Sequence, residues 1–307
     1  MNPTVTAIIL NYNDWESTQT CISSLELMHY ENLSIVLVDN NSSSYPPKIQ
    51  FQKKDYTLYD HQHIQNSYDS KGTAVLSKFK NKKPSIFSIK NYHNSGFSSG
   101  VNLGVFFAKK VYNSDYYWLL NNDTKCNPTT LKALVKKANA RCIVSSKLVS
   151  KTNQPLQSAG TIHPRFATSK PSHSKIDYLP FTSVLIHKEI FELNGPLNEN
   201  YFMYYEDVDY CKRAKQHGIQ LKLSHDSTVI HDESKTFNKN SKIKSDQIYI
   251  TSKKLFMYNH GYTKKWILFS LLLSATKRLC SGHYQSAIKI IKIAKTSPKN
   301  LIGICFD

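Results

Sequence analysis

The sequence has 307 residues, of which 40% are hydrophobic, and its 40 Lys and Arg outnumber its 22 Asp and Glu. The hydrophobic content excludes an intrinsically disordered chain, and the length allows one large domain or two ordinary ones. The formal net charge of +18 favours an anionic partner, which by charge alone is nucleic acid, anionic lipid or a phosphorylated small molecule.

The cysteines and the N-terminal stretch indicate the compartment. The six cysteines are widely spaced without a CxxC pair, so the sequence predicts neither a zinc site nor a disulfide framework. The stretch MNPTVTAIILNYND lacks a basic segment before its short apolar run, unlike a secretory signal. We therefore expect a cytoplasmic protein.

The first forty residues predict a strand, a helix and a second strand. Residues 5–10 read as a buried strand, Asp14 as the cap of an amphipathic helix, and 33–40 as another buried strand that ends at Asp39. This order implies a parallel pair, and ligands of open parallel sheets bind beyond the carboxyl ends of the strands. The residues expected there are Asn11, Asn13, Asp39 and Asn40.

The next segments contrast in composition. Residues 51–84 are polar and Lys-rich, and we expect a long excursion with at most marginal structure. Residues 85–110 then predict a strand, a Gly-rich turn and a helix that begins near Ser98 or Ser99. The GxxxGxxxG spacing from Gly96 to Gly104 fits a phosphate-binding turn and close helix packing equally well.

A third buried strand, 116–120, runs into Asn121, Asn122 and Asp123, and Pro128 is expected to open the next helix. Carboxamide and carboxylate oxygens at a strand end suit a divalent cation. An Asx turn that caps the following helix explains the same residues, and taken alone the motif slightly favours that turn.

The stretch YYEDVDYCKRAKQHG predicts a helix that ends at Gly218. Glu206 and Asp209 share one face, with Arg213 one turn beyond Asp209, and both acids suit a helix N-terminus. Asp207 points elsewhere, and the preceding aromatic run PLNENYFMYY should desolvate it and favour a role as a general base. Further on, His231 ends a predicted strand and becomes a candidate ligand in combination with Asp123, whereas His225 reads as structural or surface.

Six motifs follow one another along the chain: TAIILNYN, LVDNNSSS, NSGFSSGVNLG, WLLNNDT, FMYYEDVDYCKRAKQHG and VIHDES. In this order they resemble the motifs of the family 2 inverting glycosyltransferases, most closely the rhamnosyltransferase-like branch of bacterial surface polysaccharide assembly. The resemblance covers roughly residues 4–235. It implies an α/β GT-A domain with a mainly parallel sheet over 1–238, with 51–84 as an insertion, followed by a basic helical extension over 239–307.

The resemblance also implies roles for single residues. It makes Asp39 a contact of the nucleobase or ribose and Asp207 the catalytic base of the ED motif. Asn121 to Asp123 match the DxD metal motif with Asn121 in place of the first acid, which leaves Asp123 as the main metal carboxylate. His231 matches a position that completes the metal site in some members. The other residues expected at the nucleotide sugar are Asn11, Asn94, Gly96, Asn102, Asn121 and Asn122, and those expected to support Asp207 are Glu206, Asp209 and Arg213.

These roles imply a mechanism. A Mg²⁺ or Mn²⁺ held by Asp123 neutralises the charge of the departing nucleoside diphosphate. Asp207 removes the proton of the acceptor hydroxyl as its oxygen attacks C1 from the opposite face, which inverts the anomeric centre. The expected donor is a nucleotide-diphosphate sugar, and the expected acceptor is a glycan or a lipid-linked glycan.

The basic tail allows two interpretations. Its apolar run 266–275 is too short to span a bilayer, and 284–295 forms a basic amphipathic helix with Lys289, Lys292 and Lys295 on a three-residue spacing. Packing on the domain and lying on an anionic membrane are about equally consistent with this pattern. Lipid-linked acceptors, which are usual in the family, favour a peripheral membrane location.

Three other functions remain alternatives. A non-catalytic nucleotide-sugar-binding or regulatory protein could use the same fold. A nucleotidyltransferase also places acids and a metal on an α/β sheet, although the EDVD helix followed by VIHDES is better explained by sugar transfer. No nucleic-acid-binding motif accompanies the positive charge, so we expect no nucleic-acid partner.

Overall fold

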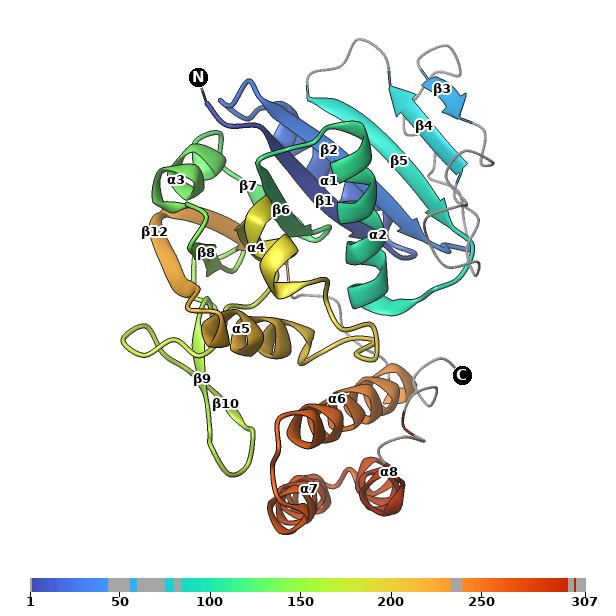
Figure 1. Ribbon diagram of the computed structural model, residues 1–307. Helices are drawn as coiled ribbons and strands as arrows, with labels where there is room; N and C mark the ends of the chain where they lie inside the picture. The colour runs from blue at the N-terminus through green and yellow to red at the C-terminus, as the bar shows by residue number, and fades with distance from the viewer. Residues whose placement is uncertain are drawn as a thin grey trace.

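The apolar runs of the sequence form the centre of one large mixed sheet, seen in the computed structural model (Figure 1). The structure describes residues 2–43, 56–59, 75–79, 84–232, 239–297 and 301. Within them, the strand order is β3-β4-β5-β2-β1-β6-β11-β8-β12-β7. The strands of this sheet are β1 Val5–Asn11, β2 Leu33–Asn40, β3 Tyr56–Tyr59, β4 Val75–Phe79, β5 Ser85–Asn91, β6 Tyr116–Asn121, β7 Thr124–Cys126, β8 Cys142–Val149, β11 Ser183–His187 and β12 Gln220–His231.

The middle of the sheet is parallel, as the strand-helix-strand order predicted. β1 pairs in parallel with β2 and β6, and β2 pairs in parallel with β5. β11 runs antiparallel between β6 and β8, and β12 returns parallel to β8. A separate hairpin, β9 Gly160–Ile162 and β10 Ser169–Pro171, projects from the sheet domain (Figure 1).

Side chains alternate between the two faces of the sheet along each strand, so apolar residues lie on both faces and helices cover both. Ala7 and Ile9 of β1 join the core beneath two helices, α1 Trp15–Glu26 and α3 Thr130–Lys137. Ile8 joins the opposite core, which contains buried residues of α2 Gly96–Val111, α4 Lys188–Asn194 and α5 Glu206–Gln216. The result is a three-layer α/β domain whose central strands are buried on both faces.

The C-terminal helices are α6 Lys239–Asn259, α7 Lys264–Cys280 and α8 Tyr284–Lys295. α6 lies next to α5, and α7 and α8 form the end of the molecule farthest from the sheet (Figure 1). Phe256 and Met257 of α6 are buried in the same core as Tyr205 and Val208 of the sheet domain. α6 therefore packs on the sheet domain. Among the described residues, no helix is long and apolar enough to cross a bilayer.

Several sequence predictions about local structure need correction. The predicted excursion 51–84 contributes two strands, β3 and β4, that extend the sheet beyond β5. The helix after the Gly-rich turn begins at Gly96, earlier than Ser98. Pro128 does not open α3, because the cap is Thr129 and the helix starts at Thr130. The cysteines at the described positions are unpaired.

Candidate functional site

The carboxyl ends of β1 and β2 bring the first predicted residues together. The strand register sets Asn11 directly beside Asp39. The Asn11 amide donates to Asp39 Oδ1 at 3.3 Å and to the Ser42 hydroxyl at 3.0 Å, and that hydroxyl donates to Asp39 Oδ1 at 2.5 Å. These bonds fix the Asp39 carboxylate at the rim of the sheet, where ligands of parallel sheets bind.

The end of β6 is tied to the same edge through α1. Asn122 donates to the Thr18 hydroxyl at 3.0 Å, and Thr18 donates to Asn11 Oδ1 at 2.8 Å. Asp14 caps α1 as predicted, because its side chain accepts from the Ser17 N–H. Asn121 lies at the last position of β6, in register with Leu10 of β1. Asn11, Asp39, Asn121 and Asn122 therefore share one edge.

A second amide cluster links β2 to the Gly-rich turn. Asn40 donates to Asn94 Oδ1 at 2.9 Å and to the Gly96 carbonyl at 3.1 Å, and Asn91 donates to Asn40 Oδ1 at 3.0 Å. Gly96 has φ = +83°, and a Cβ there would lie 2.4 Å from the Phe202 carbonyl oxygen. Glycine is required at this point, where the turn meets the loop that precedes α5.

The remaining glycines of the motif favour close packing over phosphate binding. A Cβ on Gly100 would lie 2.4 Å from Leu10 Cδ1, and one on Gly104 would lie 2.5 Å from Ile8 Cγ2. Asn102 fastens a loop to α2, because it donates to the Leu197 carbonyl and accepts from the Leu197 N–H, both at 2.9 Å. A role for Asn102 at the nucleotide stays a prediction.

Asp123 and His231 meet, although 108 positions separate them in the sequence. His231 Nε2 lies 3.2 Å from Asp123 Oδ1, and the backbone N–H of Asp232 donates to the Asp123 carbonyl at 3.0 Å. Within the part of the chain that the structure describes, the buried Asp123 Oδ1 makes no hydrogen bond besides this contact with His231. Among the described residues, no third His, Cys, Asp or Glu joins this pair to form a larger ligand set. The pair can supply two metal ligands and leave other positions to phosphate oxygens or water.

The loop before α5 is held in an uncommon conformation. Tyr204 and Tyr205 have φ values of +69° and +66°, in the left-handed region that costs a residue with a side chain about 1–2 kcal/mol. Their hydroxyls are tied down: Tyr204 bonds Ser245 at 2.9 Å, and Tyr205 donates to the Ala167 carbonyl at 2.7 Å and meets the Tyr249 hydroxyl at 3.2 Å. Because Ser245 and Tyr249 belong to α6, the C-terminal segment helps to hold the start of α5.

Asp207 and Glu206 have a low-dielectric environment at this start. Burial raises the pKa of Asp207 to about 7, although hydrogen bonds from backbone N–H groups, including that of Val208 at 2.7 Å, lower it. Burial and then the charge of Asp207 raise the pKa of Glu206 well above its ordinary value, and Glu206 Oε2 is buried without a hydrogen-bond partner. Burial thus favours the protonated form of Glu206, and the partly exposed Asp207 has a pKa near neutral pH.

Asp209 lies two positions after Asp207, and its surroundings shift its pKa in the opposite direction. His260 Nε2 lies 2.8 Å from Asp209 Oδ1, and Arg213 Nε donates to Asp209 Oδ2 at 2.9 Å. Burial alone would raise the pKa of Asp209, but these bonds and the charge of Arg213 bring it below its ordinary value. The predicted (i, i+4) pair with Arg213 is confirmed. Asp209 joins α5 to the end of α6 and supports the helix.

Sequence reasoning missed the residues that hold this site. Ser42 and Thr18 organise the strand edge. Tyr249 of α6 contacts Tyr205 in the loop before α5, and His260, directly after α6, contacts Asp209. LVDNNSSS gave a local signal for Ser42, because serine three positions after an aspartate forms such turns. No local pattern connects Tyr249 or His260 to α5, since their partners lie more than forty residues away.

Comparisons with known proteins show similarity to a hexosyltransferase in sequence and to glycosyltransferases in fold. No protein-family model matches the chain. The chain is 22% identical over 272 residues to the low-salt glycan biosynthesis hexosyltransferase Agl10 of Haloferax volcanii. The alignment covers 85% of this chain and 76% of that protein.

Solved glycosyltransferases share the fold at lower identity. The GalNAc-T7 structure with UDP, GalNAc and Mn²⁺ superposes with a TM-score of 0.57 at 13% identity, covering 92% of this chain and 59% of GalNAc-T7. The mannosyltransferase PcManGT of Pyrobaculum calidifontis, in complex with GDP-Man and Mn²⁺, gives 0.56 at 14% identity and covers 97% of this chain and 77% of PcManGT. The predicted fold class is confirmed: the chain has the α/β GT-A fold of glycosyltransferases, with a mainly parallel sheet at its centre.

Proposed function

We propose that the protein is a glycosyltransferase that moves a sugar from a nucleotide-diphosphate sugar to an acceptor hydroxyl. The observation that carries the proposal is Asp207, a partly exposed carboxylate with a pKa of about 7 at the start of α5. A group with this pKa is suited to accept a proton at neutral pH. The similarity to a hexosyltransferase and the GT-A fold support the same reaction class.

The donor is expected at the carboxyl ends of β1, β2 and β6. Asp39, held by Ser42 and Asn11, offers a fixed carboxylate to a ribose hydroxyl or a base N–H. The turn at Asn94 and Gly96 approaches the same edge through Asn40 and could present backbone N–H groups to the nucleotide. The donor sugar would then lie toward the loop at Phe202 and the start of α5.

A divalent cation fits the pair Asp123 and His231, because Asp123 Oδ1 and His231 Nε2 lie 3.2 Å apart, which is close enough for one ion to bind both atoms. Mg²⁺ commonly uses one or two carboxylates and completes its shell with water and phosphate oxygens. When bound, such an ion would neutralise the charge of the departing nucleoside diphosphate. Asn121 cannot add a negative charge, so we expect Asp123 to dominate the affinity.

The chain's own residues would perform the proton transfer. Asp207 accepts the proton of the acceptor hydroxyl while that oxygen forms a bond to C1 and the C1–O bond to the diphosphate breaks. Attack opposite the leaving group inverts the anomeric centre. The raised pKa of Glu206 beside it disfavours a second negative charge there, and Asp209 with Arg213 anchors the helix.

We infer further that the enzyme belongs to family 2, in the rhamnosyltransferase-like branch, and acts in surface polysaccharide synthesis on a glycan or lipid-linked glycan. The order of six motifs and the name of the Haloferax relative, a glycan biosynthesis hexosyltransferase, support this inference. The partition of the chain into a catalytic domain 1–238 and an extension 239–307 is part of the same proposal.

The test measures thermal stability against nucleoside diphosphates and nucleotide sugars, each with and without Mn²⁺, for the wild type and Asp123→Ala. A ligand that binds only the native state raises its stability by mass action, so one donor should give a Mn²⁺-dependent shift that the variant loses. Binding without any release of nucleoside diphosphate would favour a non-catalytic binding protein instead. No shift with any nucleotide would contradict the proposal.

A further inference from the structure

The outer face of α7 is apolar, and most of it is exposed in the described structure. Leu268, Phe269, Leu272 and Leu273 share one side of the helix and are 49%, 46%, 44% and 47% exposed. The opposite side, with Ile267 and Leu271, is buried in the core. A surface helix normally presents polar residues to water, so this second apolar face marks an interaction surface.

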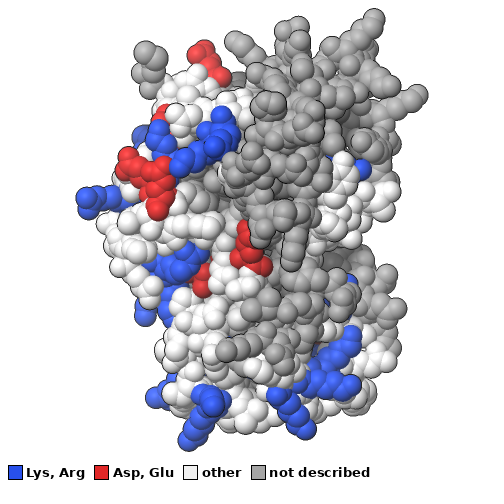
Figure 2. Space-filling model, turned by 45° about the vertical axis from the view of Figure 1, so that its right-hand side comes forward, with Lys and Arg blue, Asp and Glu red and all other residues white. Residues whose placement is uncertain are grey.

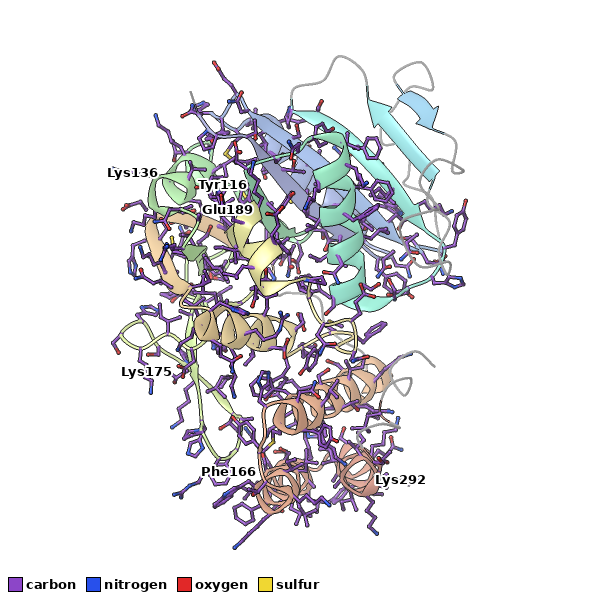
Figure 3. All side chains as sticks on the ribbon, in the orientation of Figure 1. Tyr116, Lys136, Phe166, Lys175, Glu189 and Lys292 are labelled. Carbon is purple, nitrogen blue, oxygen red and sulfur yellow. The ribbon has the colours of Figure 1, made fainter. Side chains whose placement is uncertain are left out.

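α8 continues this face. Tyr284, Ile288 and Ile291 are 65%, 54% and 37% exposed, whereas Ile290 and Ile293 are buried. α7 and α8 pack against each other and against α6, so their exposed sides turn away from the rest of the protein at the lower end of the molecule (Figure 1). Phe166, at the tip of the β9–β10 hairpin, packs on Trp266 and Phe269 and braces the outer side of α7 (Figure 3).

Exposed lysines lie among the apolar side chains, and neither helix contains an acidic residue. The exposed lysines of the two helices are Lys264, Lys265, Lys277, Lys289, Lys292 and Lys295. Arg165 of the hairpin lies over the Trp266 ring at 5.2 Å and adds one more charge. The sequence contains no Asp or Glu between positions 247 and 306. Figure 2 accordingly shows Lys and Arg, but no visible Asp or Glu, at the lower end of this view.

We propose that this α7–α8 face docks on the surface of an anionic lipid bilayer. Leu272, Leu273 and Ile288 enter the boundary between headgroups and acyl chains, where an amphipathic helix buries its apolar side. The lysines contact anionic headgroups while their aliphatic stems lie along the leucines. The sheet domain, on the far side of α6, stays in water with its candidate site accessible.

The charge pattern distinguishes a bilayer from a second copy of the chain. Self-association through this face would bring the same lysines of two copies together without an acid on the surface to compensate them. Like charges at such an interface oppose association, and they favour an anionic surface. The proposal rests on the geometry of α7 and α8 and does not depend on the proposed transferase activity.

The test is flotation of the full-length protein with vesicles of phosphatidylcholine alone and of phosphatidylcholine mixed with phosphatidylglycerol. We expect binding to the mixed vesicles, weaker binding to the neutral ones, and a decrease at high salt because salt screens the lysines. Equal binding to both vesicle types, or no binding to either, would overturn the proposal.

Two variants separate the apolar and the charged contributions. Leu272→Ser with Leu273→Ser should lower vesicle partitioning at least about tenfold, because two leucines leave the apolar phase. Lys292→Glu with Lys295→Glu should lower it at least about 25-fold, since each lysine near an anionic surface contributes about fivefold. All four side chains are exposed, so the melting temperature should stay close to that of the wild type.

The matched control is Lys132→Glu with Lys136→Glu, which makes the same change of net charge on exposed residues of α3. Lys136 and Lys292 lie at opposite ends of the molecule (Figure 3). This control should keep nearly all vesicle binding. An equal loss in the control would show a net-charge effect and contradict the proposal. If the wild type formed a dimer without lipid and the leucine variant were monomeric, the face would be assigned to self-association instead.

Discussion

Asp207 and Asp209 are two positions apart on α5, yet their surroundings give them opposite properties. Burial raises the pKa of Asp207 to about 7, and no cation in the described part of the chain lowers it. His260 and Arg213 overcome the same burial at Asp209 and lower its pKa. The difference shows that the side-chain partners, and not the position in the helix, decide which carboxylate can exchange a proton at neutral pH and which one can only support the fold.

The largest expected effect is on the chemistry. Asp207→Asn removes the proposed base while keeping the shape of the side chain, so sugar transfer should fall about 10²- to 10⁴-fold. Donor binding, read from the thermal shift with Mn²⁺, should change little, because we expect the donor at the carboxyl ends of β1, β2 and β6 and Asp207 lies on α5. Glu206→Gln is the control: a protonated Glu206 closely resembles glutamine, so most activity should remain. Full activity in Asp207→Asn would remove Asp207 from the mechanism.

The next effect is on stability. Asp209→Ala leaves His260 and Arg213 without their buried partner, and we expect a loss of about 3–5 kcal/mol in the free energy of unfolding. Because the folded-state pKa of Asp209 is depressed, its contribution is complete at neutral pH and is lost as the pH falls through that pKa. The difference between the two proteins should therefore shrink in acid.

Denaturant unfolding at several pH values measures this difference. Asp226→Ala is the matched control. Asp226 is exposed, and its carboxylate lies 3.9 Å from the Lys137 ammonium, an exposed pair that contributes about 0–1 kcal/mol. If Asp209→Ala cost no more than this control, the supporting role of Asp209 would be wrong.

On α2, Gly104 can be tested for a role in packing against a role in binding the donor. Gly104→Ala would place a Cβ 2.5 Å from Ile8 Cγ2 in the core, and overpacking of this kind costs about 1–3 kcal/mol. The donor-induced thermal shift should survive, because Gly104 packs against β1. Ser99→Ala on the same helix is the control and should stay within about 0.5 kcal/mol of the wild type. A lost donor shift in a still-folded Gly104→Ala would favour the phosphate-binding interpretation.

The smallest expected effect tests whether α6 supports the start of α5. Tyr249→Phe removes the hydroxyl 3.2 Å from the Tyr205 hydroxyl, and one hydrogen bond contributes about 0.5–1.5 kcal/mol. The left-handed loop should loosen slightly, with a small decrease in the transfer rate. Tyr258→Phe, an exposed tyrosine of the same helix, should change neither quantity. Equal effects of the two variants would separate α6 from the site.

Local patterns predicted much of the fold and the site. Apolar runs identified β1, β2 and β6, and their parallel order placed Asn11 and Asp39 at one edge, as the register confirms. The aromatic run before Glu206 indicated the desolvation that raises the pKa of Asp207. These signals were sufficient because each depends on neighbours in sequence or on a general rule of sheet topology.

Features that depend on distant partners escaped prediction. The GxxxGxxxG spacing could not distinguish phosphate binding from packing until Leu10 and Ile8 were placed beneath Gly100 and Gly104. The left-handed backbone conformation of Tyr204 and Tyr205 could not be predicted from the local sequence, since tyrosine does not favour it. The bond from His260 to Asp209 spans 51 positions and exists only because α6 returns to the domain.

The pH dependence of the transfer rate tests the division between the two carboxylates most directly. With the metal and donor saturating, kcat/KM for the acceptor should fall as the pH drops below about 7, because Asp207 becomes protonated there and can no longer accept the hydroxyl proton. Asp207→Asn should lack this acidic limb in its residual activity. A wild-type rate that stays constant from about pH 5 to 8 would contradict the assignment of Asp207 as the base.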